Sequence, residues 1–257
     1  SFPDDEFGVN QYFNEGPYAN KVANCLGTNH TEIQLTYNDA QNIIPNLSKV
    51  FSEPFADSSQ IPTLLVCDEA KKAGLSVMLS GDGGDEFFGG YNRHKIAPLL
   101  LRGLSKFPPS IKNYIAKSIK YLPDAKLALN HDKKDKLVRA IKSSDNIHSL
   151  YNALICFYTE NTNPLKQKLE IDNSSIFNSI SHSLTISEQF MLRDVINYLP
   201  SDLLVKIDRT AMSVSLETRA PFLDHRVAEM AWSLPISFKI KRNGYRYTTK
   251  WALKEIL

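Results

Sequence analysis

The sequence predicts an α/β protein with a parallel sheet near its start and a larger helical part behind it. A segment with helix caps at 59–74 leads directly into the apolar run "LSVML" at 75–79, as a helix leads into a buried strand. From about residue 95 onward, apolar side chains recur at helical spacing. We therefore expect two regions in the 257 residues, a partial α/β region at 1–95 and a mainly helical region at 96–257.

Helix-capping residues and alternating side chains predict the elements of the first region. Residues 17–26 start with a proline and stop before a glycine, which is typical of a short helix. Residues 31–37 alternate and carry β-branched side chains, which predicts a strand. Ser58 or Ser59 can cap the next helix, and Gly74 can end it in the left-handed conformation. The apolar run after it predicts a strand that is buried on both faces.

In the second region, three consecutive segments predict helices. Residues 187–199 place their apolar side chains on one face, and Pro200 should break the helix. Residues 201–213 follow, with their first serine as the cap. Asp224 can cap a third helix that stops at Pro235.

Composition excludes several classes of function. The chain carries 30 Lys and Arg against 28 Asp and Glu, so we expect neither a nucleic-acid partner nor a membrane partner. The densest basic stretch, 131–142, is interrupted by acidic residues and predicts a solvated helix face. Cys25, Cys67 and Cys156 are too far apart for a disulfide framework or a zinc site. With no signal-peptide layout, we expect a cytoplasmic protein with reduced, buried thiols.

The stretch "LSGDGGDEFFGGY" at 79–91 combines glycines with three carboxylates directly after the predicted strand. In open α/β sheets, ligands bind beyond the carboxyl ends of strands. Glycine backbone amides suit phosphate oxygens, and Asp82, Asp85 and Glu86 are hard oxygen ligands that suit Mg²⁺. The mixture favours a site for a metal-bound pyrophosphate. An acidic turn or a calcium loop is the alternative, although the calcium-loop spacing is absent.

A second charged cluster lies at 199–226 among apolar residues. Lys206 and Arg209 share a helix face, and Asp202 with Lys206 predicts a surface ion pair four residues apart. Arg219 stands in an apolar turn, where a guanidinium usually has a carboxylate or phosphate partner.

Both clusters carry a family resemblance. "LSGDGGDEFFGGYNRH" and "YLPSDLLVKIDRTAMSVSLETRAPFLDHR" closely resemble the synthetase domain of glutamine-hydrolysing asparagine synthetase. "NEGPYANKVANCLGTNHTEI" and "EPFADSSQIPTLL" match the same family in the same order, so the resemblance runs from about residue 14 to the end. It implies an adenine-nucleotide alpha-hydrolase-like (ATP-pyrophosphatase) fold with a parallel sheet. It also implies ATP and Mg²⁺ as cofactors, and aspartate and ammonia from a glutaminase domain as partners.

The implied reaction is ATP-dependent amide formation. The side-chain carboxylate of aspartate attacks the α-phosphate of ATP to give β-aspartyl-AMP and pyrophosphate, and ammonia then displaces AMP. By resemblance, Ser80 and Gly81 contact the AMP moiety. Gly83, Gly84 and Arg219 complete the expected nucleotide-binding set.

The resemblance also assigns the chemistry. Asp85 resembles the carboxylate that holds Mg²⁺ on pyrophosphate, while Asp82 and Glu86 resemble the acidic residues that face the acyl-adenylate. Lys250 resembles the lysine that stabilises charge developing during adenylation, where a fixed ammonium is most useful.

The sequence departs from the family in two ways. The family's S-G-G-x-D-S loop, its glutaminase domain and its tail after Lys250 are missing, so we expect a fragment that is inactive in isolation. Without the strands around that loop, the sheet should be reduced, rearranged or completed by another copy, and a homodimer is one expectation. Some members carry Glu at the position of Asp82, and the Asp form also occurs in relatives linked to surface-polysaccharide gene clusters.

Three functions therefore remain open. The first is the amide-forming domain of an asparagine synthetase, and the second is a related amidotransferase acting on another carboxylate. The third is an inactive fragment that serves only as a nucleotide-binding or interaction module.

Overall fold

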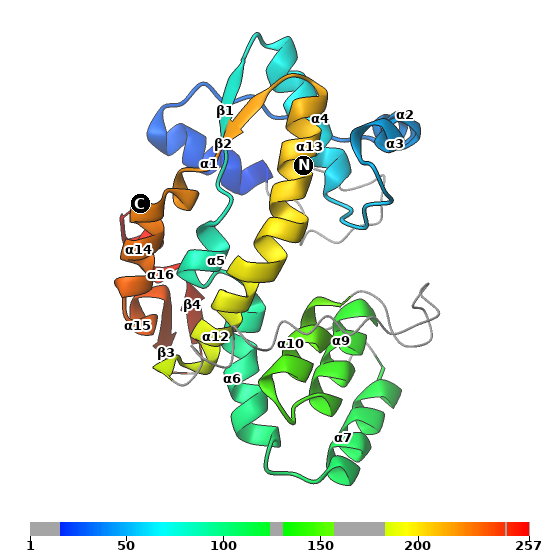
Figure 1. Cartoon of the computed structure of the whole chain (residues 1–257), viewed down its shortest axis with the longest axis vertical. Helices are drawn as coiled ribbons and strands as arrows, with labels where there is room; N and C mark the ends of the chain where they lie inside the picture. Colours follow the sequence, from blue (N-terminus) through cyan, green and yellow to red (C-terminus); the bar gives the residue numbers. More distant parts are fainter. Residues whose placement is uncertain (1–15, 124–130, 157–182, 245, 257) are drawn as a thin grey trace. The chain divides into compact units, whose positions relative to one another are not determined.

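The computed structural model describes residues 16–123, 131–156, 183–244 and 246–256 (Figure 1). The chain divides into two compact units, and it enters each of them twice. The first unit is Ser1–Asp82 with Tyr198–Pro221, and the second is Gly83–Asn197 with Phe222–Leu257. The boundary predicted at residue 95 marks a change in sequence pattern, and it stays a prediction.

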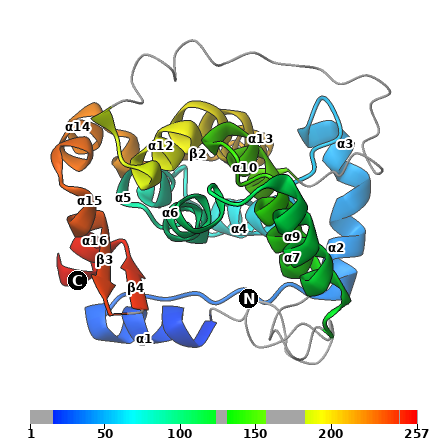
Figure 2. The same cartoon turned by 90° about the horizontal axis from the view of Figure 1, so that it is seen from below.

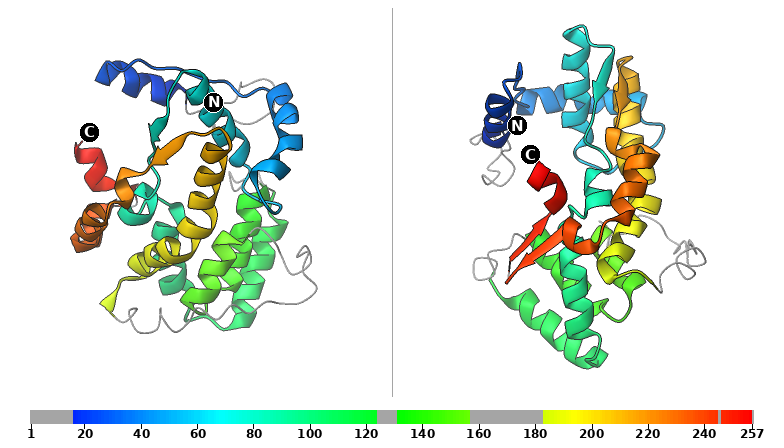
Figure 3. Two further views of the ribbon diagram at one scale, coloured as in Figure 1. Left: turned by 45° about the horizontal axis from the view of Figure 1, so that its top comes forward. Right: turned by 90° about the vertical axis from the view of Figure 1, so that its left-hand side faces the viewer.

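The first unit is built on a two-stranded parallel sheet. Strand β1 (Val77–Leu79) pairs with β2 (Glu217–Arg219), so that Met78 stands opposite Thr218. The helices of this unit are α1 (Gly16–Leu26), α2 (Tyr37–Ile43), η2 (Ile44–Asn46), α3 (Leu47–Val50), α4 (Gln60–Lys72) and α13 (Leu204–Ser213). Figure 3 shows α4 and α13 side by side, and between them they bury Cys67 and Ala211 in a small core that Met78 also contacts.

Three predictions about this unit are confirmed. Helix α1 covers the predicted 17–26, and α4 begins after Ser59, although the serine side chain makes no cap hydrogen bond. Gly74 is left-handed, with φ of 86°, and ends the α4 segment. Among the described residues helix dominates, and the parallel sheet is one pair of strands, in agreement with the expected helical chain with a small sheet.

The strand predicted at 31–37 is wrong. Residues 28–36 form no regular element, and α2 begins at Tyr37. The cause is a capping box: the Thr36 side chain accepts a hydrogen bond from Asp39 N (3.2 Å), and Asp39 Oδ2 accepts one from Thr36 N (2.9 Å). Because this box satisfies the first amides of a helix, it starts α2 where the alternation predicted a strand.

The predicted burial of β1 on both faces is also wrong. Val77 is 42% exposed and Leu79 is 69% exposed, whereas Met78 faces the core. Among the described residues β1 has β2 as its one strand neighbour, so the second face of the strand is left uncovered.

Helices form most of the second unit. In chain order they are α5 (Gly84–Phe88), α6 (Asn92–Leu104), α7 (Pro109–Tyr121), α9 (His131–Lys142), α10 (Ile147–Ile155), α12 (Ile186–Arg193), η5 (Pro221–Leu223), α14 (His225–Ser233), α15 (Ile236–Lys239) and α16 (Trp251–Ile256). Figure 2 shows α7, α9 and α10 grouped together, and an antiparallel hairpin of β3 (Ile240–Asn243) and β4 (Arg246–Thr249) precedes α16. The predicted helices at 131–142 and after Asp224 are confirmed, and Asp224 caps α14 by accepting from Arg226 N (2.9 Å).

The predicted break at Pro200 is wrong. The chain continues from α12 through a π-helical segment, η4 (Asp194–Leu203), directly into α13, and Leu203 rather than Ser201 stands at the start of α13. Proline lacks the N–H that an α-helical turn needs, and the wider π-helical turns carry the chain past it.

The thiols are only partly as predicted. All three cysteines are free, but Cys67 is buried while Cys25 and Cys156 are exposed. None of the helices described is long and apolar enough to cross a membrane.

Candidate functional site

The predicted site residues are divided between the two units. Ser80, Gly81, Asp82 and Arg219 belong to the first unit, whereas the rest of the glycine-acid loop and Lys250 belong to the second. The structure therefore defines the geometry within each group.

In the first unit, the loop leaves β1 at its carboxyl end, as predicted. Ser80 N donates to Arg219 O (2.8 Å), which extends the pairing of β1 and β2 by one bond. A Cβ at Gly81 would meet nothing within 4 Å, so this backbone is open to approach. Arg219 has the carboxylate partner that the sequence predicts, since its Nε donates to Glu217 Oε1 (2.8 Å), and both side chains are exposed.

The predicted ion pair between Asp202 and Lys206 is wrong. Lys206 Nζ instead lies 2.7 Å from Asp57 Oδ2 and 2.6 Å from Ser59 Oγ. Burial raises the pKa of Asp57, but the hydrogen bonds from Lys206 and Ser59 outweigh it and hold this pKa below its usual value. Sequence spacing favoured the neighbour on the same helix, whereas the fold supplies a carboxylate from a distant segment.

In the second unit, α5 is a short helix bounded by two left-handed glycines. Gly83 has φ of 90° and Gly89 has φ of 68°, a conformation that side chains with a Cβ rarely adopt. A Cβ at Gly83 would also lie 2.6 Å from Leu223 Cδ2. The buried Phe87 and Phe88 anchor α5 in a core with α14, which fixes the residues that precede them.

The structure brings Asp85 and Lys250 together. Lys250 Nζ lies 3.0 Å from Asp85 Oδ1, and the two side chains are 37% and 38% exposed. Lys250 has φ of 51° in the turn between β4 and α16, so it is one of two described residues other than glycine with positive φ. The two residues that the sequence assigns to metal and to developing charge thus form one ion pair.

Gly90 is the position against which the Asp85 carboxylate rests. A Cβ at Gly90 would lie 1.6 Å from Asp85 Oδ1 and 2.5 Å from its Cγ. The main chain is tied at the same place, because Gly90 N donates to Asp85 O (2.8 Å). Only glycine therefore permits the observed orientation of this carboxylate.

Glu86 is buried, with 1% of its surface exposed. Tyr91 OH donates to Glu86 Oε1 at 2.5 Å. Burial raises the pKa of Glu86 above its usual value, although the hydrogen bond from Tyr91 opposes the shift. Glu86 is thus a carboxyl group held in a fixed and poorly solvated position.

Sequence reasoning assigned no role to the residues that follow the acidic loop. Tyr91, Arg93 and His94 follow the loop in "GGYNRH", and they contact Asp194 or one another in the interior of the second unit. Asp194 is one of several polar residues in the helical segment 187–199, and nothing in the spacing marks it as a buried carboxylate.

The described carboxylates could bind Mg²⁺ only if substrate phosphates and waters supplied its other ligands. No group of three or more His, Cys, Asp or Glu residues in the described ranges could hold a metal by itself. Mg²⁺, however, is usually bound by one or two carboxylates together with substrate phosphates and waters. Asp85 is partly exposed, so its carboxylate could supply one oxygen in that mode.

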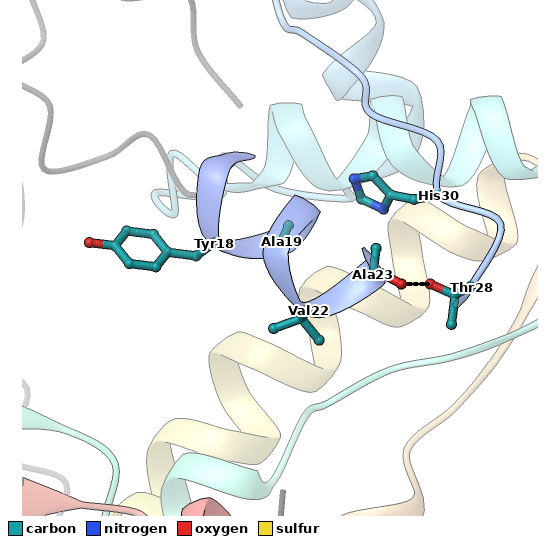
Figure 4. Close-up of a pocket in the computed structure, with 6 residues that line it drawn as sticks. All are labelled: Tyr18, Ala19, Val22, Ala23, Thr28 and His30. Atoms are coloured by element: carbon teal, nitrogen blue, oxygen red, sulfur yellow. Dashed lines mark hydrogen bonds between the residues drawn. The ribbon is translucent and has the colours of Figure 1, made fainter. Parts of the chain in front are cut away.

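Two pockets in the first unit lie away from the predicted site residues. One of about 540 Å³ is lined by α1 and the segment after it, where Thr28 Oγ1 donates to Ala23 O (3.5 Å) (Figure 4). The other, of about 360 Å³, lies between α3, α4 and the end of α13. Neither is lined by a predicted site residue.

Comparison with known proteins places the chain in a family. The sequence model of the asparagine synthase family matches residues 6–257, and the chain belongs to this family. It is 30% identical to asparagine synthetase [glutamine-hydrolyzing] 1 of Bacillus subtilis over 251 residues, which cover 95% of this chain and 38% of that protein. It is 29% identical to a putative asparagine synthetase [glutamine-hydrolyzing] of Mycobacterium tuberculosis over 245 residues, covering 95% of this chain and 37% of the relative.

A shorter match, 36% identical over 84 residues, joins it to asparagine synthetase B of Escherichia coli. The chain thus spans between a third and two fifths of the length of the Bacillus subtilis and Mycobacterium tuberculosis relatives. No solved structure matches it.

Proposed function

We propose that this chain is the ATP-dependent, amide-forming part of an asparagine synthetase. It would convert aspartate and ATP to β-aspartyl-AMP and pyrophosphate, after which ammonia released from glutamine by another part of the protein yields asparagine. The observation that carries the proposal is the ion pair of Lys250 and Asp85 beside the buried Glu86, in a chain of this family.

The first step needs positive charge near the phosphates. One oxygen of the aspartate carboxylate bonds to the α-phosphorus, and the bond from that phosphorus to the pyrophosphate oxygen breaks. Asp85 would hold Mg²⁺, which supplies charge for the β- and γ-phosphates when bound. The Lys250 ammonium is fixed by its left-handed turn and by Asp85, and a fixed cation stabilises the charge that develops as the bond breaks.

The remaining residues would bind and orient the two reactants. Ser80 and Gly81 contact the AMP moiety in this proposal, with Gly83, Gly84 and Arg219 as further nucleotide contacts. Asp82 and Glu86 face the acyl-adenylate. In the second step, the ammonia nitrogen bonds to the acyl carbon and loses one proton, and the bond from that carbon to the AMP oxygen breaks.

A related amidotransferase acting on another carboxylate is the second candidate. Asp82 is the residue that raises it, because some members of the family carry Glu at this position and the Asp form also occurs in relatives linked to surface-polysaccharide gene clusters. Aspartate and ammonia as partners, and a homodimer as the assembly, remain predictions in either case.

The test is pyrophosphate release by the full product of the gene. ATP, Mg²⁺ and ammonia are supplied with aspartate or with a panel of other carboxylic acids. Release with aspartate supports the first candidate, and release with another acid alone supports the second. Loss of release in Asp85→Asn, with glutamine hydrolysis retained, supports the metal assignment, whereas wild-type rates in that variant would contradict it. No release with any acid would leave the nucleotide-binding or interaction module as the alternative.

A further inference from the structure

We propose that Asp194 is a positioning residue for the acidic loop, because it fixes the Glu86 carboxylate through Arg93 and Tyr91. The inference rests on the proposed function only in that Glu86 acts in the reaction. The connection itself is a set of contacts within the second unit.

The first link joins Asp194 to the start of α6. Asp194 is fully buried at the point where α12 passes into η4. Arg93 Nε lies 2.8 Å from its Oδ2 and 3.0 Å from its Oδ1, and His94 Nε2 lies 2.6 Å from Oδ2. Tyr151 OH donates to Oδ1 at 2.8 Å. A buried carboxylate with these partners has one position and cannot move without leaving charge unpaired.

The second link joins Arg93 to Tyr91. The Arg93 guanidinium lies over the Tyr91 ring, with Cζ 3.8 Å from the ring centroid. The His94 ring meets the same tyrosine edge-on, with centroids 5.5 Å apart and planes at 68°. Arg93 and His94, which pack against the Tyr91 ring, are therefore both bonded to Asp194. A planar guanidinium stacks on an aromatic face in a way that an ammonium cannot reproduce.

The third link is the hydrogen bond from Tyr91 OH to Glu86 Oε1 at 2.5 Å. The backbone between the two residues is tied at Gly90, whose N donates to Asp85 O (2.8 Å), but this bond fixes the main chain and not the Tyr91 ring, and no side chain caps α6. The orientation of Tyr91, and with it that of Glu86, therefore depends on the side-chain contacts that end at Asp194.

A purely structural ion pair would stabilise the unit without reaching the loop. The pair of Lys112 and Asp145 is such a case: Lys112 is fully buried, Asp145 is half exposed, and both lie on the α7 and α9 side of the unit. Asp145→Asn is thus a control for Asp194→Asn, since each change neutralises the carboxylate partner of a cation that is at least largely buried, without altering side-chain size.

The first experiment needs no activity. A tyrosine hydroxyl proton bonded to a buried carboxylate exchanges slowly and can be followed by proton NMR, with Tyr91→Phe to assign it. In Asp194→Asn this proton should exchange at least about tenfold faster than in the wild type, and in Asp145→Asn it should be unchanged. Equal exchange in the wild type and Asp194→Asn, or equal acceleration in both variants, would overturn the proposal.

The second experiment is a double-mutant cycle on pyrophosphate release by the full gene product. Asp194→Asn should lower kcat by about tenfold or more and leave the KM for ATP within about twofold. In a Glu86→Gln background the same change should lower kcat by less than about twofold, because the carboxylate that Asp194 positions is already absent. An equal fall in both backgrounds would show that Asp194 does not act through Glu86.

Folding and function are separated by design. If circular dichroism shows that Asp194→Asn is unfolded, Arg93→Lys replaces it in both experiments, because it keeps a cation beside Asp194 but removes the flat group from Tyr91. If the wild type releases no pyrophosphate with any acid, the proposed function fails, and the exchange experiment alone decides whether Asp194 positions the loop.

Discussion

Replacing Gly90 with alanine would place a methyl group where the Asp85 carboxylate now lies. The new Cβ would be 1.6 Å from Oδ1, 2.5 Å from Cγ and 2.9 Å from Cβ of Asp85. These overlaps are too large for small adjustments, so the carboxylate must turn away and give up its 3.0 Å contact with Lys250. The change thus displaces a candidate metal ligand without altering its chemistry.

The expected loss of stability is modest. The ion pair is more than a third exposed, so its loss costs at most about 1 kcal/mol. Crowding of a packed turn adds about 1–3 kcal/mol. Gly103 offers a matched control, because it lies inside α6 and a Cβ there would meet nothing within 4 Å. Gly103→Ala should stabilise the chain by about 0.5–1 kcal/mol, the usual advantage of alanine in a helix.

Activity should fall far more than stability. Gly90→Ala should lower Mg²⁺-dependent pyrophosphate release by the full gene product about as much as Asp85→Asn, while Gly103→Ala retains the wild-type rate. Urea unfolding followed by circular dichroism measures stability, and a coupled phosphate assay measures release. A folded Gly90→Ala variant that keeps the wild-type rate, while Asp85→Asn loses it, would show that Gly90 does not position the carboxylate. A Gly90→Ala variant as stable as the wild type would show that the added methyl group meets no obstacle.

Four other outcomes are expected. Lys250→Met should lower the adenylation rate more than it weakens ATP binding, and equal losses would indicate a ground-state role. The pKa of Asp57 is lowered on folding, so its stabilising effect is present above its ordinary value of 3.8 and is lost as the pH falls below it. The free energy of unfolding should therefore fall more in the wild type than in Asp57→Asn between about pH 5 and pH 2, and parallel curves would contradict this. Burial raises the pKa of Cys67, so iodoacetamide should label it much more slowly than the two exposed cysteines, and equal labelling rates would show that it is accessible. The isolated 257-residue chain should form no pyrophosphate from ATP and aspartate, and its detection would contradict our account of the missing loop.

Local signals in the sequence predicted the helices with clear ends. The proline and glycine that bound α1, and the cap at Asp224, act within one turn of chain, so they can be read without the rest of the fold. The alternating residues at 31–37 misled because Thr36 and Asp39 form a capping box, a local signal that overrides the weaker strand pattern. The burial of β1 could not be predicted from its apolar side chains, because burial depends on which strands lie beside it.

The site was predictable in composition and only partly in arrangement. Glycines and carboxylates at one strand end indicated a phosphate and metal site, but nothing in the spacing places Lys250 beside Asp85. The need for glycine at position 90 could not be predicted either, because it arises from the contact between the Asp85 carboxylate and the Gly90 backbone. Asp194 stands in a helical segment about a hundred residues from the loop, and only the fold joins it to Tyr91 and Arg93.

The pairing of β1 with β2 has a practical consequence for deletion mapping. Any fragment that ends between residues 83 and 197 keeps β1 but lacks β2, and with it the Arg219 carbonyl that accepts from Ser80 N. Such a fragment would expose an unpaired strand whose Val77 and Leu79 are already uncovered, and it should aggregate. Loss of activity in a truncation series would therefore report a broken sheet and would not locate the reacting residues. Point substitutions, rather than nested deletions, are the suitable means to map this protein.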